Sequence, residues 1–112
     1  MLTNAHRPVW GFAAYSGVGK TTLLKQLIPL LIDKGLRVAV VKHAHHEFDI
    51  DKPGKDSHTL RKSGAEQVLI TSAKRRALMM ENAVEKDPRL DDELGYLHQD
   101  AIDLILVEGF RH

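Results

Sequence analysis

Cysteine is absent from this chain of 112 residues, and aromatic side chains make up only 5% of it. The lack of cysteine excludes a disulfide framework and any thiolate metal site. No apolar run approaches the roughly 20 residues that a membrane-spanning helix needs. The first residues, Met1 to Arg7, also lack the apolar core of a secretion signal. We therefore expect a cytoplasmic protein that has no membrane partner.

A strong excess of charge of either sign is missing as well. The formal net charge is +1, whereas a protein that binds nucleic acid by electrostatics normally carries a clear basic excess. We therefore expect no nucleic-acid partner. The apolar fraction of 43% and the charged fraction of 28% are ordinary for a soluble globular protein. The length suits a single domain that spans residues 1–112.

Short apolar runs bounded by turn residues predict three buried parallel strands, at residues 9–14, 37–41 and 102–107. Between the first two, leucine and isoleucine recur every three or four residues from Leu23 to Leu31, which predicts a helix with one buried face. Because this apolar stripe continues past Pro29, we expect the proline to kink the helix without dividing it.

The remaining segments predict a short helix between Asp56 and Gly64, an antiparallel pair of strands at 67–71 and 76–80, and a helix at 90–99. The chain stops at residue 112, where an α/β protein would turn into its next helix, so we expect a domain shortened at its C-terminus. The expected fold class is α/β. It is a P-loop NTPase-type three-layer fold, with a mostly parallel sheet and an antiparallel hairpin.

A phosphate-binding motif lies between the first predicted strand and the first predicted helix. The sequence from Ala14 to Thr21 follows the pattern G-x-x-x-x-G-K-[ST], with Ala14 in place of the first glycine. In such a loop, successive backbone N–H groups and the start of the helix form a site for phosphates. The lysine reaches the β- and γ-phosphates, and the next hydroxyl binds Mg²⁺. We therefore predict a nucleotide triphosphate site made by Ser16, Gly17, Val18, Gly19, Lys20, Thr21 and Thr22.

The metal side of such a site usually contains an acidic residue at the end of another strand. Asp103 and Glu108 flank the last predicted strand. Ligands of parallel sheets bind at the carboxyl ends of the strands, and five strand residues span about 16 Å. Asp103 would thus lie at the wrong edge. We predict that Glu108 and Thr21 hold the Mg²⁺.

A polar segment follows the second predicted strand and ends at the same edge of the sheet. It contains His43, His45 and His46, and three histidines this close allow a metal site, although simpler roles are commoner for histidine. It also contains Asp49 and Asp51, which could bind Mg²⁺ through water or orient an attacking water. We treat Asp49, Asp51 and Lys20 as candidate catalytic residues.

Four stretches together resemble the molybdopterin-guanine dinucleotide biosynthesis protein B (MobB) family. They are the P-loop with the two leucines after it, Lys42-His43-Ala44-His45-His46, Asp51-Lys52-Pro53-Gly54-Lys55-Asp56-Ser57, and Asp103 to Phe110. The P-loop alone occurs in many families, whereas the second and third stretches are much more specific. All four stretches occur in the same order as in the family, and together they cover most of the chain.

The resemblance implies a P-loop GTP-binding accessory protein with weak GTPase activity and Mg²⁺ as its metal. It implies a role in attaching GMP to molybdopterin, in which a homodimer assists the nucleotidyltransferase MobA. Two other P-loop classes stay open from the residues alone, an ATP-dependent small-molecule kinase and a switch NTPase. No Asn-Lys-x-Asp sequence is present, so the preference for guanine rests on the resemblance.

Overall fold

The computed structural model describes residues 1–12, 20–44 and 56–110. The chain divides into two compact units. The first consists of Met1–His45 with Pro88–His112, and the second of His46–Asp87. We describe each unit by itself.

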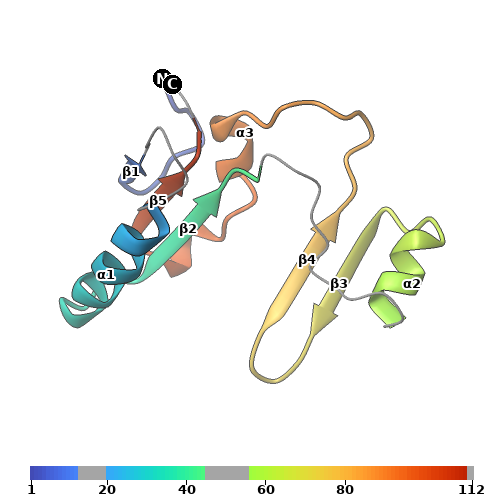
Figure 1. Ribbon diagram of the computed structural model, residues 1–112, viewed down its shortest axis with the longest axis horizontal. Helices are drawn as coiled ribbons and strands as arrows, with labels where there is room; N and C mark the ends of the chain where they lie inside the picture. Colours follow the sequence, from blue (N-terminus) through green and yellow to red (C-terminus); the bar gives the residue numbers. More distant parts are fainter. Residues whose placement is uncertain (13–19, 45–55, 111–112) are drawn as a thin grey trace. The chain divides into compact units, whose positions relative to one another are not determined.

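The first unit is built on a parallel sheet of three strands (Figure 1). These are β1 (Val9–Phe12), β2 (Val38–Lys42) and β5 (Leu104–Glu108), and their order in the sheet is β1-β5-β2. The three predicted parallel strands are confirmed, and β2 and β5 are shifted by one or two residues at their ends. Residues 13 and 14 of the first predicted strand lie outside the described residues. The expectation that all three strands are buried is wrong for β1 and β2, because only β5 consists of buried residues. The last strand in sequence lies between the first two, so β5 pairs along both of its edges.

Helix α1 (Lys20–Asp33) covers one face of this sheet. Its apolar residues recur at the spacing of one helical face, and Leu24 and Leu31 are buried against Leu104 and Leu106 of the central strand. Pro29 lies inside this single helix, so the prediction that the helix is not divided there is confirmed.

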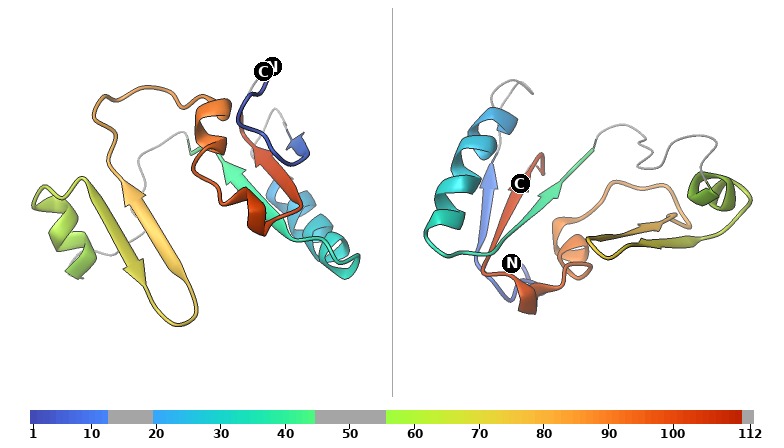
Figure 2. Two further views of the ribbon diagram at one scale, coloured as in Figure 1. Left: turned by 180° about the vertical axis from the view of Figure 1, so that it is seen from behind. Right: turned by 90° about the horizontal axis from the view of Figure 1, so that it is seen from below.

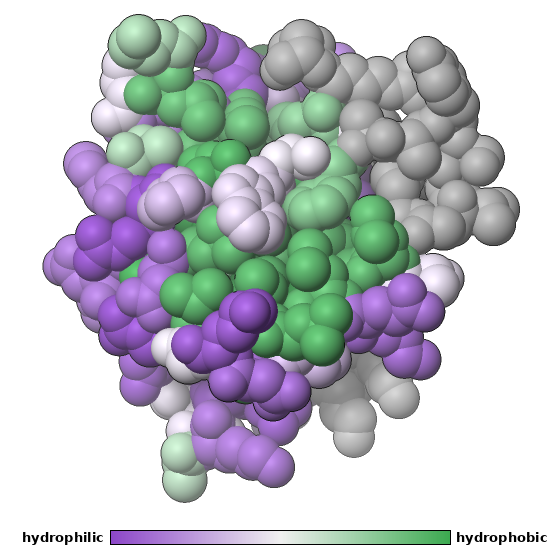
Figure 3. All heavy atoms as spheres, turned by 90° about the vertical axis from the view of Figure 1, so that its left-hand side faces the viewer, coloured by the Kyte–Doolittle hydropathy of each residue, from purple (hydrophilic) through white to green (hydrophobic). Residues whose placement is uncertain are grey.

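Coverage of this face is greatest over the central strand. Leu106 is completely buried, whereas its neighbours in register, Trp10 on β1 and Val40 on β2, are 46% and 44% exposed. Among the described residues, α1 is the helix over this face, and Phe12 of β1 and Val38 of β2 pack beside it whereas Trp10 and Val40 are partly exposed. Figure 3 shows the resulting apolar surface on the side that carries β1 and α1.

The opposite face of the sheet is covered by α3 (Leu90–Leu94) together with flanking chain (Figure 2). Leu94, Ile105 and Val107 form the buried cluster on this side. The sheet therefore has a packed layer on each face, as the α/β fold class predicted. In the part of the chain that the structure describes, no helix has the length and apolar character to cross a membrane.

The predicted helix at 90–99 is wrong beyond Leu94. After Gly95 the chain continues as a turn and then as a 3-10 helix, η1 (Gln99–Ala101). The buried side chain of Gln99 explains the early end, because it donates to the carbonyl oxygens of Leu94 (2.9 Å) and Asn4 (2.7 Å) and accepts from the N–H of His6 (2.7 Å). A polar side chain from later in the chain thus binds the last carbonyl of the helix.

The second unit contains α2 (Asp56–Lys62) and a hairpin of β3 (Gln67–Thr71) and β4 (Arg76–Met80). The predicted antiparallel pair is confirmed with its predicted bounds, and its register runs from Gln67 opposite Met80 to Thr71 opposite Arg76. The side chain of Ser72 organises the turn, where it accepts from the N–H groups of Lys74 and Arg75. Arg61 of α2 donates to Glu81 at 2.9 Å, which joins the helix to the end of the hairpin.

Candidate functional site

The three parallel strands end together at one edge of the sheet. Phe12, Glu108 and Lys42 are in register across β1, β5 and β2. The chain leaves β1 at this edge, and α1 begins at Lys20 after the intervening residues 13–19. The motif therefore has the strand before it and the helix after it that a P-loop requires. The predicted site residues Ser16, Gly17, Val18 and Gly19 lie outside the described residues.

The start of α1 is suited to an anion. Its first turn contains Lys20, Thr21 and Thr22 and has no acidic residue. The first N–H groups of a helix have no partner within the helix, and the helix dipole gives this end a partial positive charge. Many helices place Asp or Glu here, whereas this one offers a lysine and two hydroxyls. A helix start without an acidic residue in its first turn suits an external anion such as a phosphate.

Glu108 is the carboxylate at this edge. It is the last residue of β5, and only 7% of its surface is exposed. A buried carboxylate is costly unless a cation or hydrogen-bond donors lie near it. Lys42 lies directly across the strand pair from Glu108. The sequence places both residues at the ends of parallel strands but does not show that these two strands are neighbours. The position and burial of Glu108 suit a residue that faces a cation.

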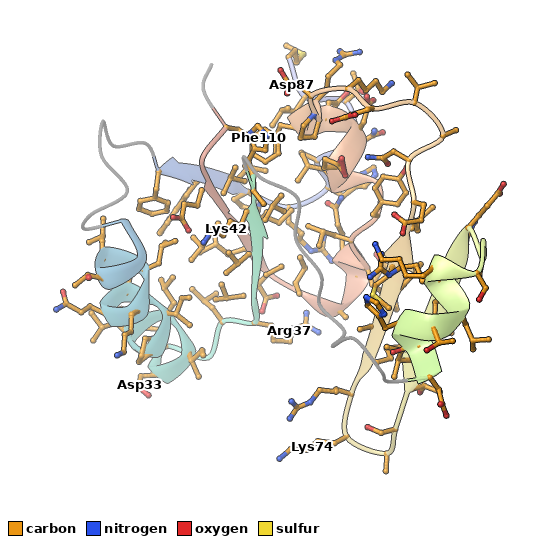
Figure 4. The ribbon with its side chains drawn as sticks, turned by 45° about the vertical axis from the view of Figure 1, so that its right-hand side comes forward. Asp33, Arg37, Lys42, Lys74, Asp87 and Phe110 are labelled. Atoms are coloured by element: carbon orange, nitrogen blue, oxygen red, sulfur yellow. The ribbon has the colours of Figure 1, made fainter. Side chains whose placement is uncertain are left out.

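The turn after Glu108 packs tightly against the end of β2. His43 donates its backbone N–H to the carbonyl oxygen of Glu108 at 3.0 Å, and its ring lies 5.1 Å from that of Phe110. Gly109 has φ +91°, and a Cβ there would lie 3.2 Å from the carbonyl oxygen of His43. Figure 4 shows Phe110 beyond the end of β2 that carries Lys42. The glycine therefore permits a close approach that holds the end of β5 against β2.

Asp103 lies at the opposite edge of the sheet, as predicted. Its carboxylate accepts from the backbone N–H of Arg37 at 2.8 Å and from the guanidinium at 3.0 and 3.1 Å. These bonds lower the pKa of Asp103 to about 2. Arg37 precedes β2, at the end of that strand far from Phe110 in Figure 4. Asp103 thus ties two strands together and takes no part in the nucleotide edge.

The candidate catalytic residues Asp49 and Asp51 lie outside the described residues, and so do His45 and His46. Of the three histidines, the structure describes His43, whose ring lies against that of Phe110 with the two ring planes tilted by 30°. Across residues 1–12, 20–44 and 56–110, no three His, Asp or Glu side chains lie close enough to hold a metal ion.

A cavity of about 400 Å³ lies between the N-terminal segment and the chain around η1. Its lining includes Asn4, His6, His98 and Asp100. None of the predicted site residues lines it. Gln99, which also lines the cavity, accepts from the N–H of His6 and donates to the carbonyl oxygen of Asn4.

Comparison with known proteins identifies close relatives. The model of the family described as "MobB: Molybdopterin guanine dinucleotide synthesis protein B" matches residues 9–112. The molybdopterin-guanine dinucleotide biosynthesis adapter protein of Escherichia coli (strain K12) is 51% identical over 105 residues, which cover 94% of this chain and 60% of that protein. The Haemophilus influenzae protein with the same description is 44% identical over 111 residues, covering 99% and 61%. The chain thus spans about three fifths of the length of these relatives.

A solved structure shares the fold. The MobB protein homologue from Bacillus stearothermophilus superposes with a TM-score of 0.64 at 27% identity, and the match covers 91% of this chain and 55% of that chain.

Proposed function

Because this chain belongs to the molybdopterin guanine dinucleotide synthesis protein B family, we propose that it is a GTP-binding adapter in the attachment of GMP to molybdopterin. One observation carries the nucleotide part of the proposal. The start of α1, which has no acidic residue in its first turn, and the buried Glu108 belong to the same edge of the parallel sheet. An anion site and a carboxylate at one edge are what a magnesium nucleotide needs.

The residues at this edge fit a magnesium nucleotide. Backbone N–H groups from Ser16 to Gly19 would surround the phosphates, and Lys20 would reach the β- and γ-phosphates. Thr21 would bind Mg²⁺ directly, with Thr22 beside it, and Glu108 would stand on the metal side. Bound Mg²⁺ would offset the negative charges of the phosphates and of Glu108. The burial of Glu108 and its lysine neighbour in register support this assignment.

In this proposal the protein mainly binds GTP and hydrolyses it only slowly. Asp49 and Asp51 belong to the segment that leaves the carboxyl end of β2, the strand that ends beside Glu108. We assign to one of them the task of orienting the attacking water, while Lys20 stabilises charge on the γ-phosphate. A low turnover suits a protein whose task is to hold a nucleotide for a partner.

The partners in this proposal are the nucleotidyltransferase MobA and molybdopterin or its guanine dinucleotide. The chain would act in the cytoplasm as a homodimer. The word adapter in the descriptions of the Escherichia coli and Haemophilus influenzae relatives supports a role in assembly with other proteins.

A titration of GTP against ATP, with and without Mg²⁺, tests the nucleotide site. We expect GTP to bind more tightly and Mg²⁺ to strengthen the binding. The variant Lys20→Ala should weaken GTP binding by about tenfold or more, because it removes the cation at the phosphates. Lys25→Ala is the matched control, since Lys25 is an exposed lysine of the same helix and lies outside the motif.

Glu108→Gln tests the metal side separately. It should reduce the effect of Mg²⁺ on GTP affinity, with Asp103→Asn at the other edge of the sheet as its control. Preferential binding of ATP with transfer of phosphate to a metabolite would instead favour a small-molecule kinase. Equal GTP affinities for the wild type and Lys20→Ala would overturn the proposed site.

A further inference from the structure

The cavity beside η1 has the features of a binding site that the proposed nucleotide site does not use. Its volume of about 400 Å³ lies within the range of small-molecule sites. The N-terminal segment contributes Asn4 and His6 to its lining, and the chain after α3 contributes His98 and Asp100. All of these residues belong to the first unit. The cavity is therefore formed within one compact unit, by two segments that are far apart in the sequence.

Two amide side chains hold the wall of this cavity in place. Gln99 is buried, and it joins the two segments by accepting from the N–H of His6 and donating to the carbonyl oxygen of Asn4. Asn4 in turn donates its backbone N–H to the carboxylate of Asp91 and its side-chain amide to the carbonyl oxygen of Asp91, both at 2.8 Å. A wall that is fixed before a ligand arrives loses little conformational freedom when the ligand binds.

Three other polar side chains at the cavity keep their hydrogen-bonding capacity. Among the described residues, no hydrogen bond or ion pair engages the imidazoles of His6 and His98 or the carboxylate of Asp100. These groups do not converge on one point, since no three His, Asp or Glu side chains in the described ranges could hold a metal ion. A ligand that uses all three groups must therefore be larger than a single ion.

The charge at the cavity indicates the chemistry of that ligand. In the part of the chain that the structure describes, neither lysine nor arginine lines the cavity, so it does not suit a phosphate. The carboxylate of Asp100 can accept two parallel N–H bonds. An imidazole can stack on a flat ring or bond to its edge, and Leu97 adds an apolar contact. A flat, uncharged ring with two adjacent N–H donors fits this set.

We propose that the cavity is a second ligand site, which binds an aminopyrimidinone ring through the carboxylate of Asp100. Such a ring has a ring N–H and an amino group side by side on one edge, and the two carboxylate oxygens match these donors. His6 and His98 would contact the rest of the ring. Pterins and guanine both contain this ring, so the inference rests on the proposed function for its two sources, molybdopterin and the guanine nucleotide.

The cavity and the proposed nucleotide site share no residue. His6 precedes β1 and Asp100 precedes β5, whereas the phosphate-binding motif and Glu108 lie at the carboxyl ends of these strands. The nucleotide site takes phosphates and a cation, and the cavity takes an uncharged ring. The two proposals can therefore fail independently of each other.

Quenching of the fluorescence of unsubstituted pterin, titrated with the full chain, tests the site. We expect pterin to bind and Asp100→Asn to weaken the binding by about tenfold or more, because the amide replaces one acceptor oxygen with a donor. Asp92→Asn is the matched control. Asp92 is an exposed aspartate of α3 that does not line the cavity, and its variant changes the net charge equally. The control should bind pterin like the wild type.

His98→Ala tests the contribution of an imidazole. It should weaken pterin binding by about threefold or more, because it removes one hydrogen-bonding group and its flat face. His58→Ala is its control, since His58 lies on α2 in the second unit. It should leave pterin binding unchanged.

Competition by guanosine distinguishes the two sources of the ring. If the pterin binds more tightly, Asp100→Asn should leave GTP affinity unchanged. If guanosine binds more tightly, the same variant should also lower GTP affinity. Both results support a site for the shared ring. Absence of binding by both compounds at their solubility limits would overturn the site, and so would pterin binding that Asp100→Asn leaves intact. Failure of GTP to bind, with pterin binding that depends on Asp100, would overturn the nucleotide site alone.

Discussion

Gly109 shows how one residue can control the geometry of the nucleotide edge. It follows the buried Glu108 and has φ +91°, a conformation that residues with a side chain rarely adopt. Its missing Cβ also allows the carbonyl of His43 to approach. Both properties hold the end of β5 against the end of β2, beside the proposed metal position.

We predict that Gly109→Ala destabilises the protein by about 2 kcal/mol, because the new methyl group adds a close contact to an unfavourable dihedral angle. Gly35→Ala is the matched control. Gly35 has nearly the same φ, +87°, but nothing lies within 4 Å of the position its Cβ would take. It should therefore lose only the dihedral part, about 1 kcal/mol.

Urea denaturation of both variants measures the two free energies of unfolding. If the contact with His43 matters, Gly109→Ala should also lower GTP affinity while Gly35→Ala does not. Equal losses of stability at both sites would show that the contact contributes nothing.

Among the elements, β5 depends on both of its neighbours. It pairs with β1 and β2. Asp103, the residue before β5, accepts three hydrogen bonds from Arg37, the residue before β2, and so fixes the start of β5. The pKa of Asp103 falls to about 2 because these bonds favour the charged carboxylate. The contribution of Asp103 to stability is therefore present above the ordinary pKa of aspartate and is lost as the pH falls toward 2.

We predict that the melting temperature of the wild type falls more steeply between pH 5 and pH 2 than that of Asp103→Asn, which has no carboxylate to protonate there. Circular dichroism melts across this range measure the difference. Asp87→Asn gives a carboxylate control outside the sheet, and its profile should follow the wild type. Parallel profiles for the wild type and Asp103→Asn would show that the bonds to Arg37 do not stabilise the fold.

The molecule as a whole consists of two compact units, and the nucleotide edge belongs to the first. A ligand that binds only the folded state stabilises it by about 2.7 kcal/mol at 100 times its dissociation constant. If the two units unfold independently of each other, the ligand stabilises only the unit that binds it.

We predict that saturating GTP and Mg²⁺ slow amide exchange in β2 and β5 of the first unit much more than in β3 and β4 of the second. Hydrogen exchange read by mass spectrometry measures both. Lys20→Ala at the same GTP concentration is the control and should show the protection in neither unit. Equal slowing in the two units would mean that they unfold as one.

The sequence by itself determined the features that depend on neighbouring residues. The spacing from Leu24 to Leu31 predicts α1, because an amphipathic helix repeats every 3.6 residues. Two short strand candidates joined by a short turn predict the hairpin with its correct bounds. The strand before the phosphate-binding motif and the helix that begins at Lys20 could also be predicted, because both adjoin the motif in the sequence. The edge of the sheet at which Glu108 lies followed from strand direction alone.

Only the tertiary structure decided the features that join distant residues. The place of β5 between β1 and β2 depends on pairing across more than 60 residues, for which no local spacing exists. The early end of α3 depends on the side chain of Gln99 folding back onto it. The burial of Glu108 beside Lys42 and the exposure of Leu69 depend on what packs nearby. Local dihedral preferences decide which elements form, whereas the energy of long-range packing decides which of their faces meet.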